Sequence, residues 1–411
     1  MKLSTGERWD LIDRISKETV TFGAYKHSLK DAIGELTVKP MTGIPVAIAI
    51  MYGFWSVFGS FAGFFTDGFF VRLFDAYWLP WLQEVFPGQG GWLYTIMVDA
   101  GGIESGEFVL SSNCLESFGV LTSGIFVAVG VVLPAIIIFY LMLALLEDIG
   151  YMPRLAVLLD TVLHRVGLHG YAIVPTILSL GCNVPGVAAT RILETKKQRF
   201  IMMTLLAIFI PCGAQISIMQ GMMPDLMGWI LLYLIIGYFI FGYILNKIVP
   251  GKAPEFLIDV PPYRRPLFSN VGKKVGGRVR GFFVVAIPFV LLGCAIVGVL
   301  YQLGVIRFLG DTLAPVFVGW FGVPKETAGP LIAAFLRKDL AVAQLSAITM
   351  TPYQLITSVV LVSIYFPCVA TFAMMLKEGW KELLGSLAVL TVVVFAYGGL
   401  IHLIGILLGV A

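Results

Sequence analysis

The chain has 411 residues, of which 58% are hydrophobic and only 13% are Asp, Glu, Lys or Arg. Soluble domains are roughly 45–50% apolar and about 25% charged. A soluble protein of this size needs more polar residues to cover its surface, so the composition excludes the soluble, disordered and fibrous classes and predicts an integral membrane protein. The five cysteines, an odd number without a CxxC pair, do not form a disulfide framework, and the net charge of +3 says little.

Charge-free runs mark the candidate spans. A helix needs about 20 apolar residues to cross a hydrocarbon core of roughly 30 Å, because lipid offers no partner to backbone polar groups. Such runs lie at 41–63, 119–146, 200–224, 226–246, 281–306, 354–376 and 383–411. Two further apolar stretches, 171–190 and 328–348, contain Gly, Pro or charges, and we expect re-entrant hairpins or interrupted helices there. The predicted fold class is an all-α polytopic membrane protein with about seven or eight transmembrane helices.

The loops predict an orientation, because cytoplasmic loops are enriched in Lys and Arg. Segment 64–118 has one basic residue against seven acidic ones, whereas segment 247–280 has eight basic residues against two acidic ones. We therefore expect the first segment outside the cell and the second inside. The outer segment contains aromatic residues that suit helices in the headgroup layer, namely Tyr77, Trp78, Trp81 and Trp92.

The two halves of the chain resemble each other weakly. Proline, glycine and Pro-Cys positions recur at offsets of 154 to 156 residues. The pairs are Pro134 and Pro288, Gly150 and Gly304, Pro175 and Pro330, and Pro211-Cys212 and Pro367-Cys368. By the charge count the two units are inverted in the membrane, and inverted repeats with broken helices are typical of transporters. The alternative is chance, since Gly and Pro are common in membrane helices.

The most unusual string is Gly181-Cys182-Asn183-Val184-Pro185-Gly186. Gly and Pro on both sides should unwind the helix, because proline donates no backbone hydrogen bond and clashes with the preceding turn. Irregular backbone at membrane depth is tolerated only where it is buried in protein or lines a cavity. Pro211 and Pro367 likewise free the carbonyl group four residues before each of them, beside Cys212 and Cys368.

Three thiols at three helix breaks, together with the amide of Asn183, are candidate ligands of a cation path. Thiolates favour soft or borderline metals. The alternative is that each cysteine is a small apolar filler, and this is what we expect of Cys114 and Cys294.

Two charged strings lie near the apolar runs. Arg337-Lys338-Asp339 is costly in a membrane unless it faces a vestibule or headgroups, so it predicts a gate or a helix-end anchor. Glu147-Asp148 at the inner end of a span is either an attractor of cations or a solvated helix end. The sequence has no GxxxxGK[ST], HExxH or GxSxG motif, so we do not expect an enzyme.

Several strings resemble the membrane part of ferrous iron transport protein B (FeoB), in order from Arg8 to the C-terminus. They are WDLIDRI at 9–15, LEDIGYM at 146–152 with Arg154, GCNVP at 181–185 followed by Ala189-Thr190-Arg191, Cys212-Gly213-Ala214, Pro261-Pro262-Tyr263-Arg264 and Pro367-Cys368-Val369. The resemblance implies a polytopic Fe2+ importer with two gate regions, normally fused behind a GTP-binding domain. It also implies metal-path cysteines at Cys182, Cys212 and Cys368. Iron rests on the resemblance alone, since thiols suit Cu(I) or Zn2+ as well.

The chain departs from the family in three ways. The GTP-binding domain is missing and Met1 reads as a natural start, so we expect a GTPase on a separate chain. Family members commonly have Ser-Cys-Gly-Ala-Arg where this chain has 211–215, and Ala-Lys-Glu where it has 337–339. These changes affect charge near the expected path.

Five parts follow: a cytoplasmic amphipathic N-terminal segment (1–40), a first span with an external interfacial loop (41–118), a first gate repeat (119–249), a basic cytoplasmic linker (250–280) and a second gate repeat (281–411). We expect import of Fe2+ as a substrate across the cell membrane, with no tightly bound cofactor. The expected partners are the bilayer, the GTPase and a possible second copy of the chain, but no nucleic acid. The rival hypotheses are a gate-type transporter of a small organic solute such as a nucleoside, and a non-conducting scaffold for the GTPase.

Overall fold

The computed structural model describes residues 14–15, 18–19, 29–86, 91–98, 102–104, 107–109, 119–251, 263–281, 283–284, 287–335 and 338–409. Within these ranges the regular secondary structure is helical apart from one antiparallel hairpin of β1 (Gly102–Glu104) and β2 (Glu107–Val109). Six helical stretches of the described residues are long and apolar enough to cross a membrane: Pro40–Val85, Ala128–Ile149, Lys196–Met222, Pro224–Ile248, Pro352–Glu378 and Trp380–Leu407. The protein is therefore an all-α polytopic membrane protein, as predicted.

The six stretches correspond to six of the seven charge-free runs. The seventh run, 281–306, contains α14 (Ile287–Gln302), a helix of 16 residues, while residues 282, 285 and 286 lie outside the described ranges. The difference from the expected seven or eight spans therefore arises at α14 and at the interrupted segments, whose helices are short.

The N-terminal part is dominated by one long helix. It comprises α3 (Pro40–Phe65), the π-helical turns η1 (Thr66–Val71) and η2 (Phe74–Trp78), and α4 (Leu79–Val85). Its 46 residues correspond to about 70 Å, more than twice the thickness of a hydrocarbon core. The expected first span thus does not end at residue 63 but continues into the segment expected outside. Short helices α2 (Leu29–Val38) and α5 (Trp92–Met97) flank it.

Two sets of helices follow in the same order. The first set is η3 (Val120–Gly124), η4 (Phe126–Val132), α6 (Leu133–Ile149), α7 (Tyr151–His164), η5 (Gly170–Ala172), α8 (Ile173–Gly181), α9 (Asn183–Ala189), η6 (Thr190–Ile192), α10 (Lys196–Phe209), α11 (Gly213–Met222) and α12 (Pro224–Ile248). After α13 (Phe268–Gly281), the second set is α14, α15 (Val305–Phe321), η8 (Lys325–Thr327), α16 (Ala328–Ala333), α17 (Lys338–Ala347), α18 (Pro352–Ile364), α19 (Val369–Glu378) and α20 (Trp380–Leu408).

Equivalent helices make equivalent contacts. Helix α9 packs on α19 while α17 packs on α11, and α12 packs on α18 while α20 packs on α10. Gly150, which joins α6 to α7, and Gly304, which joins α14 to α15, both have positive φ (88° and 69°), a conformation that glycine adopts without steric cost. These paired contacts and paired glycines are what the predicted internal repeat requires.

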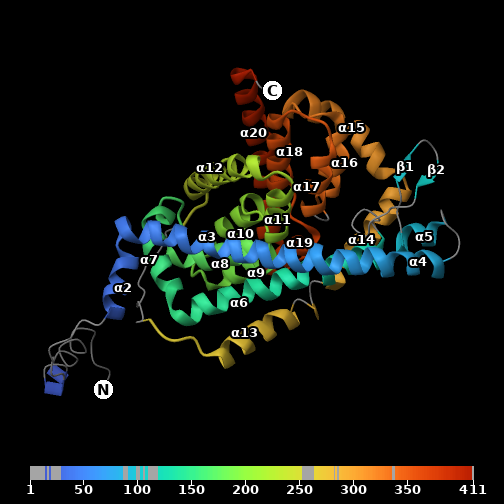
Figure 1. Cartoon of the computed structure of the whole chain (residues 1–411). Helices are drawn as coiled ribbons and strands as arrows, with labels where there is room; N and C mark the ends of the chain where they lie inside the picture. Colours follow the sequence, from blue (N-terminus) through green and yellow to red (C-terminus); the bar gives the residue numbers. More distant parts are fainter. Residues whose placement is uncertain are drawn as a thin grey trace, which may run out of the picture.

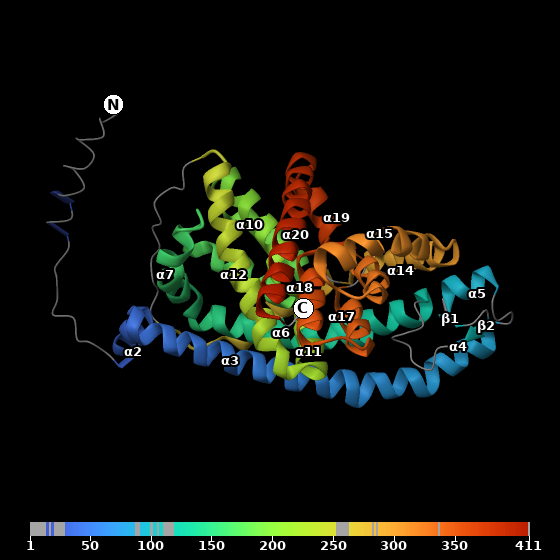
Figure 2. The same ribbon diagram turned by 90° about the horizontal axis from the view of Figure 1, so that it is seen from above.

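The two repeats pack around an apolar core, and helices α3 and α13 pack against α6 of the first repeat. Helices α10, α12, α18 and α20 group at the centre (Figure 2), where Phe209 stacks on Phe241 with ring centroids 5.7 Å apart. Helix α3 runs beside α6, and α13 packs on the same helix (Figure 1). The breaks in the spans follow directly after the ends of α10 and α18, beside this core.

Candidate functional site

Each of the three cysteines predicted to line the metal path lies at a break between two helices. Cys182 separates α8 from α9 in an extended conformation (φ −154°, ψ 133°). Cys212 precedes α11 and Cys368 precedes α19, each directly after a proline. The expected helix interruptions in 171–190 and at both Pro-Cys pairs are therefore present. A fourth break separates α16 from α17, and Arg337 there lies outside the described residues.

The first break folds back tightly. A Cβ atom on Gly186 of α9 would lie 1.8 Å from the Oγ atom of Ser179 in α8, so α9 lies directly against α8. Only a residue without a side chain permits this approach. The segment 171–190 thus has the shape of the expected hairpin.

The breaks meet in two equivalent pairs. A Cβ atom on Gly213 would lie 3.3 Å from the carbonyl oxygen of Leu180, which brings the start of α11 against the end of α8. In the second repeat, the backbone N–H of Val369 donates to the carbonyl of Phe335 at 3.0 Å. Leu180 and Phe335 are 155 residues apart and Gly213 and Val369 are 156 apart, so the two contacts are counterparts in the two repeats.

The three thiols lie at the junction of the repeats. Cys182 is close enough to interact electrostatically with Cys212 and Cys368, and Cys212 interacts in the same way with Lys338 and Asp339. All three cysteines are half-buried, and the Sγ atom of Cys368 lies 3.1 Å from the Oγ1 atom of Thr371. Over the described part of the chain, no three His, Cys, Asp or Glu side chains form a group that could hold a metal ion.

Two buried amide side chains add acceptors to the junction. Asn183 donates from Nδ2 to the carbonyl of Ile210 at 3.2 Å, while its Oδ1 atom has no hydrogen-bond partner within the described ranges. Gln215 donates from Nε2 to the Oγ atom of Ser363 at 2.5 Å, and its Oε1 atom likewise has no partner there. Sequence reasoning selected Asn183 but noted Gln215 only as a replacement for arginine.

Lys338 is the site residue whose place sequence reasoning missed. Its side chain is only 5% exposed, and Nζ donates to the carbonyl oxygens of Ala207 at 3.2 Å and Ser363 at 2.7 Å. These are the two carbonyls four residues before Pro211 and Pro367. The sequence shows separately that the two prolines free these carbonyls and that a charged residue is costly in a membrane segment. It does not show that the lysine contacts the carbonyls.

The remaining cysteines lie elsewhere or outside the described residues. Cys294 belongs to α14, and its Sγ atom packs near Gly124 of η3. Cys114 lies outside the described ranges.

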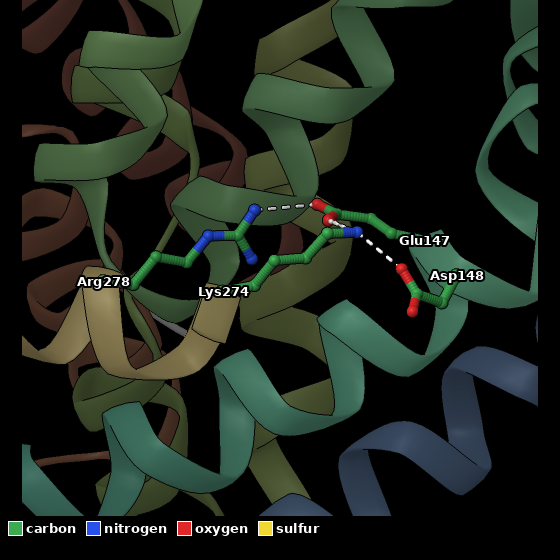
Figure 3. A network of polar contacts seen from close by, with 4 residues as sticks. All are labelled: Glu147, Asp148, Lys274 and Arg278. Atoms are coloured by element: carbon green, nitrogen blue, oxygen red, sulfur yellow. Dashed lines mark hydrogen bonds and ion pairs between the residues drawn. The ribbon is translucent and has the colours of Figure 1, made fainter. Parts of the chain in front are cut away.

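A second cluster ties the basic linker to the first repeat. Lys274 of α13 donates to Asp148 at 2.6 Å and to Glu147 at 3.4 Å, and Arg278 donates to Glu147 at 2.9 Å (Figure 3). The acidic pair at the end of α6 is thus occupied by linker side chains. The hydrogen bond with Asp148 raises the pKa of Lys274 above its ordinary value, because it stabilises the ammonium form.

The neighbouring motif residues strengthen this attachment. The guanidinium group of Arg154 lies 3.7 Å from the ring centre of Tyr263, and the Tyr263 hydroxyl is 3.0 Å from the Oγ1 atom of Thr37. Pro261 and Pro262 lie outside the described ranges. The strings at 146–154 and 261–264 therefore meet in space and join α2, α7 and the linker.

We expect Asp148→Asn to loosen α13 and to raise the rate of tryptic cleavage after Arg280 about two- to fivefold, since partly exposed ion pairs are weak. Trypsin is used at pH 8, where both members of the wild-type Lys274–Asp148 pair are charged. Lys274 stays charged until the pH rises through its raised pKa, above the ordinary lysine value of about 10.5. Glu35→Gln, which breaks the exposed Glu35–Lys39 pair of α2, is the matched control. Equal cleavage rates for both variants would mean that the pair does not hold α13.

Two family models match the chain. Gate, described as nucleoside recognition, matches 129–225 and 283–380, and FeoB_C, described as ferrous iron transport protein B C terminus, matches 226–278. The Gate matches contain all three junction cysteines. The two models together cover more than half of the chain, whose architecture is that of a multi-pass membrane protein with two gate repeats.

The curated relatives are named Fe(2+) transporter FeoB. The relative from Staphylococcus aureus (strain MSSA476) is 26% identical over 67% of this chain and 47% of its own length. The relative from Methanocaldococcus jannaschii is 25% identical over 98% of this chain and 63% of its own length, and that from Campylobacter jejuni is 29% identical over 70% and 44%. The chain belongs to the FeoB family and corresponds to its membrane part. It spans about half the length of the curated relatives it matches.

One solved structure aligns along most of the chain. It is titled "Structure of CNTnw in an inward-facing substrate-bound state", and the alignment covers 90% of this chain and 96% of that one, with 14% identity and a TM-score of 0.46.

Proposed function

We propose that the chain imports Fe2+ across the cell membrane along a path between the two gate repeats. Cys182, Cys212 and Cys368 act as transient ligands, and Asn183 and freed backbone carbonyls complete the path. The observation that carries this proposal is the convergence of three thiols from three helix breaks at one junction. Family membership supports iron as the metal, since the curated relatives are named Fe(2+) transporters.

The chemistry of the junction suits a borderline metal in transit. A thiolate binds Fe2+ more readily than it binds Mg2+ or Ca2+, which prefer oxygen ligands. Conduction needs binding that is strong enough to draw the ion in and weak enough to release it. Ligand sets of one thiol with an amide or carbonyl oxygen, exchanged from break to break, meet both needs.

The equivalent contacts between repeats supply a mechanism for alternating access. Helices α9 and α19 pack together at the junction, and so do their counterparts α17 and α11. A small rocking of one repeat against the other exchanges which pair closes the path, as inverted-repeat transporters do.

The linker offers a route for regulation by the GTPase, which we expect on a separate chain. The loop charges lead us to expect the N-terminus and 250–280 in the cytoplasm, with α13 as a basic helix on that face. It is bonded to Glu147 and Asp148 at the end of α6, the helix that enters the first gate repeat. A GTPase that moves α13 therefore acts on this repeat directly. The possible homo-oligomer stays a prediction.

Anaerobic Fe2+ flux into proteoliposomes that contain the purified chain tests the proposal. We expect saturable Fe2+ entry that Zn2+ or Mn2+ competes with and a nucleoside does not. Competition by the nucleoside alone would favour the organic-solute hypothesis. GTPase binding without flux of any ion, with the partner present, would favour the scaffold.

The polar side chains of the broken segments weigh against the organic solute. Thr176 donates to the carbonyl of Ala172 and Ser346 donates to that of Ala343, both at 2.7 Å. The Ser346 hydroxyl also lies 3.1 Å from the Sδ atom of Met222, so both hydroxyl protons have acceptors within the protein and are not presented to a base or a sugar.

A further inference from the structure

We propose that Lys338 is the tethered occupant of a cation site formed by the carbonyls of Ala207 and Ser363, and that a divalent cation passes the junction by displacing its ammonium group. This rests on the proposed function only in naming Fe2+ as the passing cation.

The two carbonyls are exposed by the prolines. In a continuous helix the carbonyls of Ala207 and Ser363 would accept from the backbone N–H four residues later, but Pro211 and Pro367 have no N–H to give. Both oxygens instead accept from the Nζ atom of Lys338, at 3.2 and 2.7 Å. A single ammonium group therefore binds one freed oxygen from each repeat and bridges α10 to α18.

The surroundings of this ammonium group provide further ligands for a cation. The hydroxyl of Ser363 accepts from Gln215, whose Oε1 atom is buried and has no partner over the described part of the chain. The thiols of Cys212 and Cys368 lie within electrostatic range of Lys338. Carbonyl oxygens, an amide oxygen and thiols are cation ligands, so Lys338 lies among groups that can bind a cation.

The first repeat shows what the lysine replaces. Lys338 is 155 residues after Asn183, so the two occupy the same position in the repeats, and both donate to carbonyls beside a break. Asn183 keeps a free acceptor, whereas an ammonium group has three donors and no acceptor. Asn183 can therefore contribute to metal binding, but Lys338 can only stand in for the metal.

Competition follows from charge and from shared ligands. An ammonium group and a divalent cation repel each other strongly where water is scarce, and both need the oxygens of Ala207 and Ser363. Fe2+ cannot occupy the site until Lys338 has left it. The lysine thus closes the path when no metal is bound and sets the concentration of Fe2+ at which it opens.

The test measures anaerobic Fe2+ binding, by equilibrium dialysis, and Fe2+ flux for wild type and three variants in lipid. Lys338→Gln removes the charge, Lys338→Arg keeps it, and Lys197→Gln is the matched control. Lys197 also donates from Nζ to two backbone carbonyls, those of Asn246 at 2.8 Å and Gly251 at 3.1 Å, on the linker side of α12.

We expect Lys338→Gln to lower the Fe2+ concentration for half-saturation at least about tenfold, because a buried like charge is removed. Lys338→Arg should bind no more tightly than wild type, and Lys197→Gln should stay within about twofold of it. If wild type transports Fe2+ and Lys338→Gln binds it equally or less tightly, the inference is overturned and the proposed function stands. If neither binds nor transports Fe2+, both fail. Tight binding by Lys338→Gln alone supports the inference and not the proposed transport.

A second measurement needs no substitution and so does not depend on folding of a variant. A small amine-reactive reagent is applied to the wild-type chain with and without saturating Fe2+, and modification of Lys338 relative to Lys197 is read by mass spectrometry. Displacement by Fe2+ should raise modification of Lys338 several-fold relative to Lys197. An unchanged ratio would contradict displacement.

Discussion

Replacing Cys182 with serine is expected to lower saturable Fe2+ flux about tenfold or more while the protein still folds. Serine has nearly the same size, so the turn between α8 and α9 is preserved, but its hydroxyl oxygen is a harder donor than sulfur and a poor ligand for a borderline metal. Cys182 also interacts with both other junction cysteines, so its loss affects every step of the exchange. The measurement is anaerobic flux into proteoliposomes, normalised to folded protein.

Cys294→Ser is the matched control for this loss. This variant also exchanges sulfur for oxygen, but Cys294 lies in α14 and packs near Gly124 of η3. We therefore expect less than about a twofold change in flux. If Cys182→Ser transports as fast as Cys294→Ser, the thiol of Cys182 is a space-filling group and the cysteine path is wrong. Cys212→Ser and Cys368→Ser should resemble Cys182→Ser, since all three thiols share one junction.

The parts of this fold that follow from local chemistry were predictable. A proline removes one hydrogen bond and affects only the preceding turn, so Pro211 and Pro367 locate two breaks without knowledge of the rest of the chain. Gly150 and Gly304 mark the equivalent helix junctions for the same local reason, since each has a positive φ. Their recurrence predicted the repeat before any contact was known.

The position of Lys338 depends on tertiary structure and could not be predicted. The sequence shows only that a charged string within an apolar segment is costly. Its ammonium group reaches the carbonyls of Ala207 and Ser363 because α17 packs on α18 and α10 packs on α18 as well. The periodicity of the sequence does not contain this helix packing. The contact of Arg154 with Tyr263 is of the same kind, because it joins two strings more than 100 residues apart.

The long N-terminal helix shows where a charge count misleads. Acidic residues after position 64 predicted the side of the membrane and suggested an end to the span. Charged residues do not by themselves end a helix, and Pro80, which has no N–H to donate, lies just after the π-helical turn η2, where the regular hydrogen-bond ladder is already interrupted. The helix therefore continues to Val85.

Gly186→Ala is expected to destabilise the first hairpin and abolish most of the flux. The added Cβ atom would lie 1.8 Å from the Oγ atom, 2.8 Å from the Cβ atom and 2.9 Å from the backbone nitrogen of Ser179. Because one of these atoms belongs to the backbone, a rotamer change cannot make room, and α9 must move away from α8. Overpacking of this kind costs about 1–3 kcal/mol. We expect a lower thermal midpoint in detergent and a displaced Cys182.

Gly272→Ala in α13 and a compensating change at position 179 separate overpacking from a general intolerance of alanine. Nothing lies within 4 Å of a Cβ atom on Gly272, and alanine is the better helix former, so that variant should not lower the midpoint and should keep the wild-type flux. Ser179→Gly removes two of the three obstructing atoms and should restore part of both quantities to Gly186→Ala. A double variant no better than Gly186→Ala would show that the third contact, with the backbone nitrogen of Ser179, is sufficient to hold the hairpin apart. A wild-type midpoint and flux in Gly186→Ala itself would contradict the close approach of α9 to α8, and with it the geometry that places Cys182 and Asn183 at the junction.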